Sequence, residues 1–140
     1  KAAGFELAPV LWQTGWHEER LIAVKMLESQ GKKDPARLFT LFKKFAADID
    51  NWAICDAMGM QMLRGIVKTH RNEIFALAEK YIKDNNPWKR RLALVMTEWY
   101  TRHAAEYTAI RSLMSQVEND DAYYVKKALT WLQRNFEKKK

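Results

Sequence analysis

Two side chains on one predicted helix, Trp52 and Asp56, form the combination in this sequence that packing alone explains least well. They are four residues apart, which places both side chains on the same face of a helix. Taken singly, the tryptophan reads as a core residue and the aspartate as an exposed charge or the partner of an arginine or lysine. An aspartate at an otherwise apolar position needs such a partner, because burying its charge alone costs several kcal/mol. The pair is therefore the first candidate for chemistry.

Basic residues further along the chain are suited to binding phosphate groups. Trp88 and Arg91 are three residues apart on one helix face, and Arg90 adds a second guanidinium. The planar fork of donors on arginine matches phosphate oxygens, so we expect Arg91 to point into a groove and meet a phosphate. The alternative is that Trp88 anchors the start of its helix and the basic residues form a solvated face.

A stripe of basic and aromatic side chains lies near the end of the sequence, with Lys127, Trp131 and Arg134 at spacings of four and three. Such a stripe fits a surface that follows a nucleic-acid backbone. The alternative is that Trp131 belongs to the core and that Lys127 simply faces solvent.

Other kinds of site have no support in the sequence. The three histidines lie far apart and have no metal-ligand spacing with the single cysteine, so we predict neither a metal nor a cofactor. We find no glycine-rich phosphate loop and no serine nucleophile turn. The residues considered for a metal are His17, His70, His103 and Cys55.

Composition limits the class of protein. The 140 residues are the length of one domain, and the net charge of +7 suggests a polyanionic partner, such as nucleic acid, an anionic membrane or an acidic protein. The same excess of charge could serve solubility alone. No apolar run approaches the ~20 residues that span a bilayer, and the lone cysteine fits a reducing compartment. Because the chain starts at Lys1, we expect a fragment of a longer domain.

The elements that carry these residues repeat along the chain at a period of about 35 residues. Aligning position 18 with 52, 88 and 123 puts an alanine five residues on in every copy, and a methionine or tryptophan eight residues on. A period of this size in a helical sequence indicates stacked helix pairs. The shared alanine indicates close packing of the second helix of each pair, and we expect the methionines of the second set to be core. The two sets are Ala23, Ala57, Ala93 and Ala128, and Met26, Met60, Met96 and Trp131.

The spacing of apolar residues predicts eight helices and no strand. Start signals are clearest at Asp34–Pro35 and Asn86–Pro87, where a capping residue precedes proline, and glycines at 15 and 31 mark two helix ends. We therefore predict an all-α fold, an α-solenoid of HEAT-like helix pairs in a single domain over residues 1–140. Its second helices would form a concave binding surface. The predicted helices cover residues 5–14, 17–30, 35–47, 52–67, 72–84, 87–102, 105–117 and, after a cap at 120 or 121, the stretch to 136.

Four segments of the chain resemble one known family. Residues 51–56 read NWAICD, residues 86–93 read NPWKRRLA and residues 126–134 read KKALTWLQR, while residues 11–20 read LWQTGWHEER. Together they are similar to DNA alkylation repair glycosylases of the HEAT-like, AlkD type, over nearly the whole chain and in the same order. Members of that family carry further helices before the segment equivalent to position 11, so the chain looks like a family domain without its N-terminal helices.

The resemblance implies an enzyme that removes positively charged N3- and N7-alkylated purines from double-stranded DNA, without a pocket for the base. It implies that Asp56 is the catalytic carboxylate, and that Trp52, Arg91 and Trp131 line the DNA groove. We expect the DNA backbone to be held by Arg90, Lys127 and Arg134.

The residue types fit this chemistry. As the glycosidic bond of a cationic purine breaks, the sugar becomes cationic, and a fixed carboxylate stabilises that charge and positions water. Indole faces attract cations. We expect a monomer in the cytoplasm, associated with the nucleoid when it is bound to DNA, with no membrane partner.

Two other functions fit the same sequence. One is a protein that binds DNA structure through the same groove without catalysis. The other is a HEAT-type scaffold whose groove binds a peptide or a helix. The first predicts salt-sensitive DNA binding with no base release, and the second predicts no DNA affinity at physiological salt.

Overall fold

The computed structural model describes residues 3–138, and in that range every regular element is helical, with no strand. The predicted all-α fold is confirmed, and so is the count of α-helices within the described range. The eight helices are α1 (Ala3–Gln13), α2 (His17–Gln30), α3 (Pro35–Ala46), α4 (Trp52–Ala57), α5 (Arg71–Tyr81), α6 (Pro87–Val95), α7 (Tyr107–Ser115) and α8 (Tyr123–Lys138).

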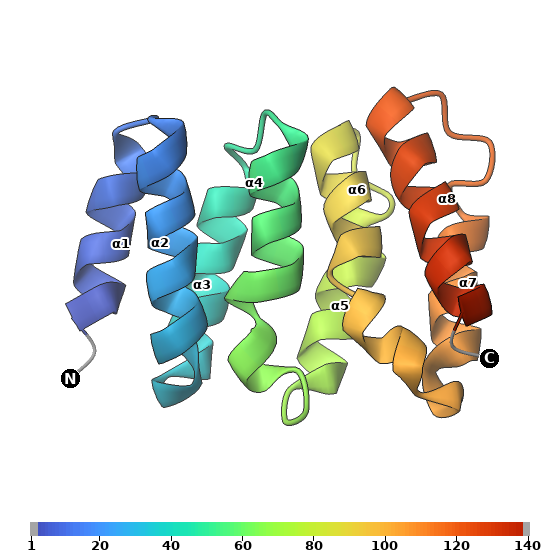
Figure 1. Cartoon of the computed structure of the whole chain (residues 1–140), viewed down its shortest axis with the longest axis horizontal. Helices are drawn as coiled ribbons and strands as arrows, with labels where there is room; N and C mark the ends of the chain where they lie inside the picture. Colours follow the sequence, from blue (N-terminus) through green and yellow to red (C-terminus); the bar gives the residue numbers. More distant parts are fainter. Residues whose placement is uncertain (1–2, 139–140) are drawn as a thin grey trace. The chain divides into compact units, whose positions relative to one another are not determined.

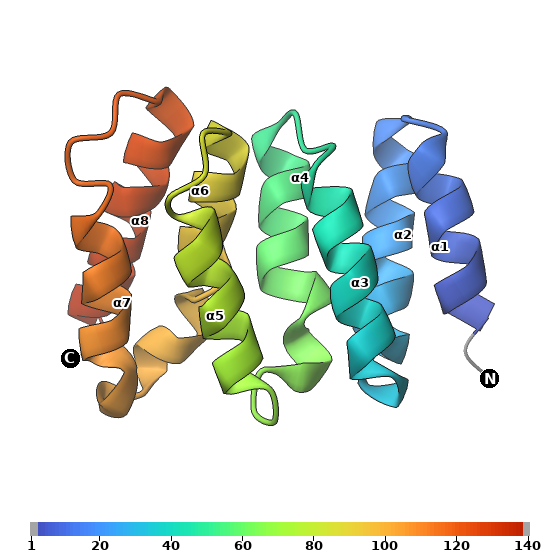
Figure 2. The same cartoon turned by 180° about the vertical axis from the view of Figure 1, so that it is seen from behind.

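The helices group into two compact units, the first ending at Arg71 and the second beginning at Asn72. In the first unit, α2 and α4 lie side by side in one layer, and α1 and α3 form the other layer (Figures 1 and 2). In the second unit, α6 and α8 share one layer and α5 and α7 the other (Figures 1 and 2). Within each unit the helix-pair arrangement that the sequence repeat predicts is confirmed.

Side-chain caps fix where three of the helices begin. The Asp34 side chain accepts a hydrogen bond from the Arg37 amide at 3.2 Å, and Pro35 follows as the first helical residue. Asn51 accepts from the Ile54 amide at 3.0 Å and so fixes the start of α4. Asn86 accepts from the Trp88 amide at 2.9 Å at the start of α6. These caps set which residue becomes the first in each helix, and thereby which face each later side chain occupies.

Two glycines end helices for different physical reasons. Gly15 has a φ of +77°, a left-handed conformation that favours glycine, and it turns the chain from α1 into α2. Gly31 has an ordinary helical conformation, but a Cβ there would lie 2.6 Å from Cδ2 of the buried Leu38. At that position the absence of a side chain lets α3 approach the end of α2.

The four alanines of the repeat are all buried, at 0–6% exposure. They lie on α2, α4, α6 and α8, the helices that form one layer in each unit. A methyl group at this level leaves room for a neighbouring helix, so the predicted packing role of the column is supported in every copy.

Two predicted helices are shorter than their apolar patterns suggest. The helix expected over 52–67 is regular only as far as Ala57; a π-helical turn, Met58–Met62, and a 3₁₀ turn, Arg64–Ile66, follow. The helix expected over 87–102 ends at Val95, and a 3₁₀ segment, Glu98–Arg102, continues it. Here the Thr97 hydroxyl donates to the Leu94 carbonyl at 2.9 Å, and such local bonds compete with the regular helix ladder.

We predict that Ala93→Leu destabilises the protein by about 1–3 kcal/mol, because extra carbons in a filled core displace their neighbours. Ala93 is fully buried on α6, whereas Ala76 on α5 is exposed and provides a matched control for the same change. Urea unfolding followed by circular dichroism measures both variants. Equal stability of Ala93→Leu and Ala76→Leu would contradict the packing role of the alanine column.

Candidate functional site

The start of α4 presents the tryptophan and the aspartate that the sequence singles out. Trp52 is the first residue of the helix and its side chain is 52% exposed, while Asp56, one turn on, is half-buried. Ile54, on the opposite side of α4, is fully buried, and so is Cys55. The indole ring and the carboxylate therefore share the outward side of α4, as their spacing predicts.

The repeat column that contains Asp56 is not uniformly core. Ile22, the residue aligned with Asp56 on α2, is 50% exposed, and only the aligned Leu92 is fully buried. The expectation that the methionine column is core is also wrong for the first unit, since Met60 is exposed and Met26 half-buried. The outward side of α2 and α4 thus combines apolar side chains with the Asp56 carboxylate. Asp56 does not replace a buried core residue.

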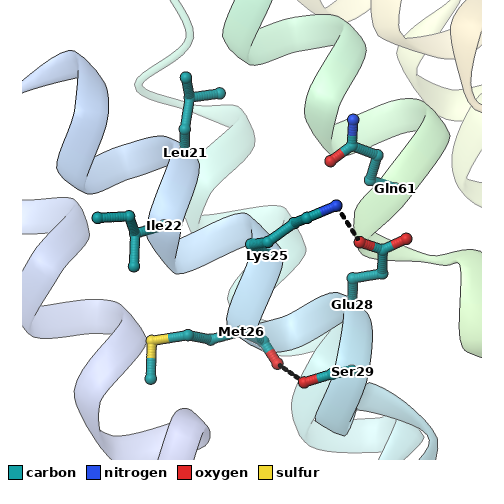
Figure 3. Close-up of a pocket in the computed structure, with 7 residues that line it drawn as sticks. All are labelled: Leu21, Ile22, Lys25, Met26, Glu28, Ser29 and Gln61. Atoms are coloured by element: carbon teal, nitrogen blue, oxygen red, sulfur yellow. Dashed lines mark hydrogen bonds and ion pairs between the residues drawn. The ribbon is translucent and has the colours of Figure 1, made fainter.

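A groove lies along α2 beside the turn that continues α4 (Figure 3). Its volume is about 920 Å³, and its wall is mainly apolar. In Figure 3, Ile22 and Met26 point to one flank, while Lys25, Glu28 and Gln61 face one another on the other flank. The lining residues are Leu21, Ile22, Lys25, Met26, Glu28, Ser29 and Gln61.

Basic groups at this groove are already paired. The Lys25 Nζ lies 3.2 Å from the Glu28 Oε1, and the Arg64 Nη1 donates to the Glu28 Oε2 at 2.9 Å. One carboxylate thus holds two cations from different elements. This arrangement links α2 to the segment after α4 and fixes the polar flank of the groove.

In the second unit, Arg91 is buried, with only 8% exposure, and its expected contact with a phosphate stays a prediction. Its Nη1 donates to the Tyr124 carbonyl at 2.6 Å, and its guanidinium carbon lies 5.8 Å from the centre of the Tyr124 ring. Trp88 stacks on the same ring at 5.1 Å with an angle of 29° between the planes. Arg91 and Trp88 of α6 together hold the start of α8 in place.

Arg90 makes a second attachment between α6 and the loop before α8. Its Nε and Nη2 donate to the two carboxylate oxygens of Asp120, at 2.7 and 3.1 Å. Its Nη1 donates to the carbonyl oxygens of Asp84 and Asn85, at 2.9 and 3.0 Å. All three guanidinium nitrogens are committed within the chain, so we assign Arg90 a positioning role and leave it out of the DNA contacts proposed below.

The contact with Arg90 changes the pKa of the Asp120 carboxyl. Burial raises its pKa, but the Arg90 hydrogen bonds, the Ala122 amide and the charges of Arg90 and Lys126 outweigh burial. The pKa of Asp120 is therefore below its ordinary value. The sequence suggests Asp120 only as a cap for α8, and nothing in its local pattern reveals the pairing with Arg90 thirty residues earlier.

The outer side of α8 carries the predicted basic and aromatic stripe. Lys127 and Arg134 are exposed and Trp131 is half-buried, while the inner side of the helix packs through Val125, Ala128, Leu132 and Phe136. Tyr123, four residues before Lys127, extends the same side and is 62% exposed. The repeat alignment places Tyr123 in one column with Trp52, and that is the signal by which the sequence could have identified it.

Two structural observations concern other classes of site. Among residues 3–138, no group of three or more histidine, cysteine, aspartate or glutamate side chains is placed to hold a metal ion. Within the same part of the chain, no helix has both the length and the apolar character needed to cross a bilayer.

Comparison with known proteins identifies the family. The family model for DNA alkylation repair enzymes matches residues 2–140. The chain belongs to the DNA alkylation repair enzyme family. Membership places the protein in DNA repair and agrees with the resemblance carried by its Trp52–Asp56, 86–93 and 126–134 segments. No curated protein and no solved structure gives a significant match to this member of the family.

We predict that Asp120→Asn lowers the free energy of unfolding by about 1.5–3 kcal/mol at pH 7, the range for a hydrogen bond to a charged group. Because folding lowers the pKa of Asp120, the carboxylate stabilises the fold above its unfolded pKa of about 3.9. That contribution disappears as the pH falls through the lower, folded pKa.

The difference in unfolding free energy between wild type and Asp120→Asn should therefore be largest near neutral pH and shrink below about pH 4. Urea unfolding at a series of pH values measures it. Asp121→Asn makes the same change at an exposed neighbour and should leave stability near wild type. A difference that is the same at pH 3 and pH 7 would show that Asp120 acts without its charge.

Proposed function

We propose that this protein is a DNA glycosylase that removes positively charged N3- or N7-alkylated purines by hydrolysis of the N-glycosidic bond. The observation that carries the proposal is the pairing, on the outward side of α4, of a half-exposed indole with a carboxylate one turn away. Membership of the DNA alkylation repair enzyme family supplies the class of substrate. The residue roles below are part of the proposal.

The proposed reaction breaks the bond between C1′ of the deoxyribose and the purine nitrogen. The bonding electrons leave with the purine, whose positive charge they neutralise, and the sugar becomes an oxocarbenium ion. Water then adds to C1′ and releases a proton, which gives a free alkylpurine and an abasic site. The purine's own positive charge makes it a good leaving group, so the chain needs to stabilise the sugar cation rather than protonate the base.

Asp56 has the role of stabilising that cation and orienting the water. A carboxylate that is fixed on a helix before reaction needs little rearrangement as the charge develops, and this is where electrostatic catalysis gains most. The half-buried position of Asp56 strengthens the effect, because charges interact more strongly away from bulk water.

Trp52 has the role of holding the cationic purine. The face of an indole attracts a cation by about 0.5–2 kcal/mol, depending on how far the contact excludes water. In the second unit, we assign Arg91 and Trp131 to the DNA groove, and Lys127 and Arg134 to phosphates of the backbone. Phosphate contacts of this kind fix the position of the protein on DNA without reading its sequence.

Asp56→Asn should lower the rate of base release by about 10²–10³, the usual effect of losing one electrostatic contact to a developing charge. The assay uses a duplex with a single 7-methylguanine, under single-turnover conditions, with the released base measured by chromatography. Asp50→Asn is the matched control, since Asp50 is an exposed carboxylate in the loop just before α4. Equal release by wild type and Asp56→Asn would exclude the catalytic role of Asp56, and no release by folded wild type would exclude this function.

Trp52→Ala should lower base release by about 2- to 30-fold, which is the cation–π range expressed as a rate. Trp52→Phe keeps an aromatic face and should retain most of the activity. Trp16→Ala is the control, because Trp16 is also exposed before α2 but has Arg20 rather than a carboxylate four residues on. A loss as large in Trp16→Ala as in Trp52→Ala would mean that the effect reflects exposed tryptophan in general.

A further inference from the structure

The first turn of α8 brings an exposed tyrosine and a lysine together. Tyr123 is 62% exposed, and the Lys127 Nζ lies 5.3 Å from the centre of its ring. Tyr124 meets Tyr123 edge-on, with ring centres 4.9 Å apart and an angle of 85° between the planes. Among the described residues, no carboxylate forms an ion pair with Lys127. Its ammonium is therefore held by an aromatic face and is available to an anion.

The backbone below these side chains is fixed by α6. The Tyr124 carbonyl accepts from Arg91, and the Tyr124 ring lies under Trp88. Just before the helix, Asp120 is held by two hydrogen bonds from Arg90 and accepts a third from the Ala122 amide at 2.9 Å. A ligand at Tyr123 and Lys127 would meet a prepared surface, which lowers the entropic cost of binding.

The repeat alignment gives this site a counterpart in the first unit. Tyr123 and Lys127 occupy the positions of Trp52 and Asp56: an exposed aromatic residue at the first position of the second helix, then a charged residue four positions on. The local arrangement is the same but the charge is reversed. A carboxylate beside an aromatic ring suits a cation, whereas an ammonium in that position suits an anion.

We propose that Tyr123 and Lys127 form a binding site for one phosphodiester group of a nucleic-acid strand. The Lys127 ammonium pairs with one phosphate oxygen, and the Tyr123 hydroxyl donates a hydrogen bond to the same group. The Lys127 ammonium lies over one face of the Tyr123 ring and the Tyr124 ring stands nearly perpendicular to it, and the phenol hydroxyl supplies the hydrogen-bond donor for the ligand. The choice of a nucleic-acid strand rests on the proposed function, while the phosphate chemistry rests on the two side chains.

The test is binding of a fluorescently labelled, undamaged duplex, measured by anisotropy across a salt series. Lys127→Gln should reduce the slope of log affinity against log salt by about 0.9, the value for one lost phosphate contact. Tyr123→Phe keeps the ring and should weaken binding about 3- to 10-fold with an unchanged slope, because it removes a neutral donor. The double variant should lose less than the two effects combined, since both groups hold one phosphate.

Lys126→Gln is the matched control, because Lys126 is also exposed on α8 but its charge acts on Asp120. Circular dichroism and thermal unfolding confirm that each variant is folded. The site would be overturned if Tyr123→Phe bound the duplex with wild-type affinity. It would also be overturned if Lys126→Gln and Lys127→Gln lowered the salt slope of duplex affinity equally. Titration with inorganic phosphate separates the two sources of this chemistry: Lys127-dependent phosphate binding without duplex binding would overturn the assignment to a strand.

Base release distinguishes this inference from the proposed function. Tyr123 and Lys127 effects on duplex binding in a protein that releases no alkylpurine would leave the phosphate site intact and exclude the glycosylase. Normal base release together with unchanged duplex binding in Lys127→Gln, Tyr123→Phe and the double variant would exclude the phosphate site and leave the glycosylase proposal intact.

Discussion

The column of buried alanines is the constraint on which the placement of the functional side chains depends. A single methyl group at Ala57 and at Ala128 leaves room for the helix next to it in the same unit, so that side of α4 or α8 must face inward. Helical geometry then fixes the remaining directions. The residue just before each of these alanines, Asp56 or Lys127, is turned by about 100° from the packed methyl group and is half-buried or exposed. Packing at one position thus decides where the charged group of each unit lies.

Adjacent arginines on α6 show how the same side chain serves different purposes. Arg90 and Arg91 differ by one residue and therefore by about 100° around the helix. Arg90 reaches the loop before α8 and binds Asp120, while Arg91 reaches the first turn of α8 and binds the Tyr124 carbonyl. Removing a buried partner from either contact leaves polar groups without compensation, which destabilises a fold more than the contact itself stabilises it. Both arginines therefore position the side chains of α8, whatever further contact Arg91 makes.

Much of this fold can be predicted from the sequence, because its signals are local. Asp34 and Asn86 each precede a proline and cap a helix, and the 35-residue period identifies the second helix of every pair. The π-helical turn after Ala57 could not be predicted, since its buried residues Met58 and Met62 are four apart, a spacing that an α-helix would also place on one side.

The exposure of apolar residues on the outward side of α2 and α4 could not be predicted for a related reason. From the sequence, Met26 and Met60 are expected to be core residues, but only the positions of neighbouring elements decide whether an apolar side chain is covered. For the site, the sequence predicts that Trp52 and Asp56 share a face, and the structure agrees.

The pairing of Arg90 with Asp120 depends on contact between segments thirty residues apart, which no local pattern encodes. Repetition helps where local signals fail: a column shared with Trp52 marks Tyr123, although tyrosine at a helix start is unremarkable by itself. The aromatic ring recurs while the charge beside it reverses from Asp56 to Lys127, so under the two proposals this one position decides whether each site binds a cation or an anion.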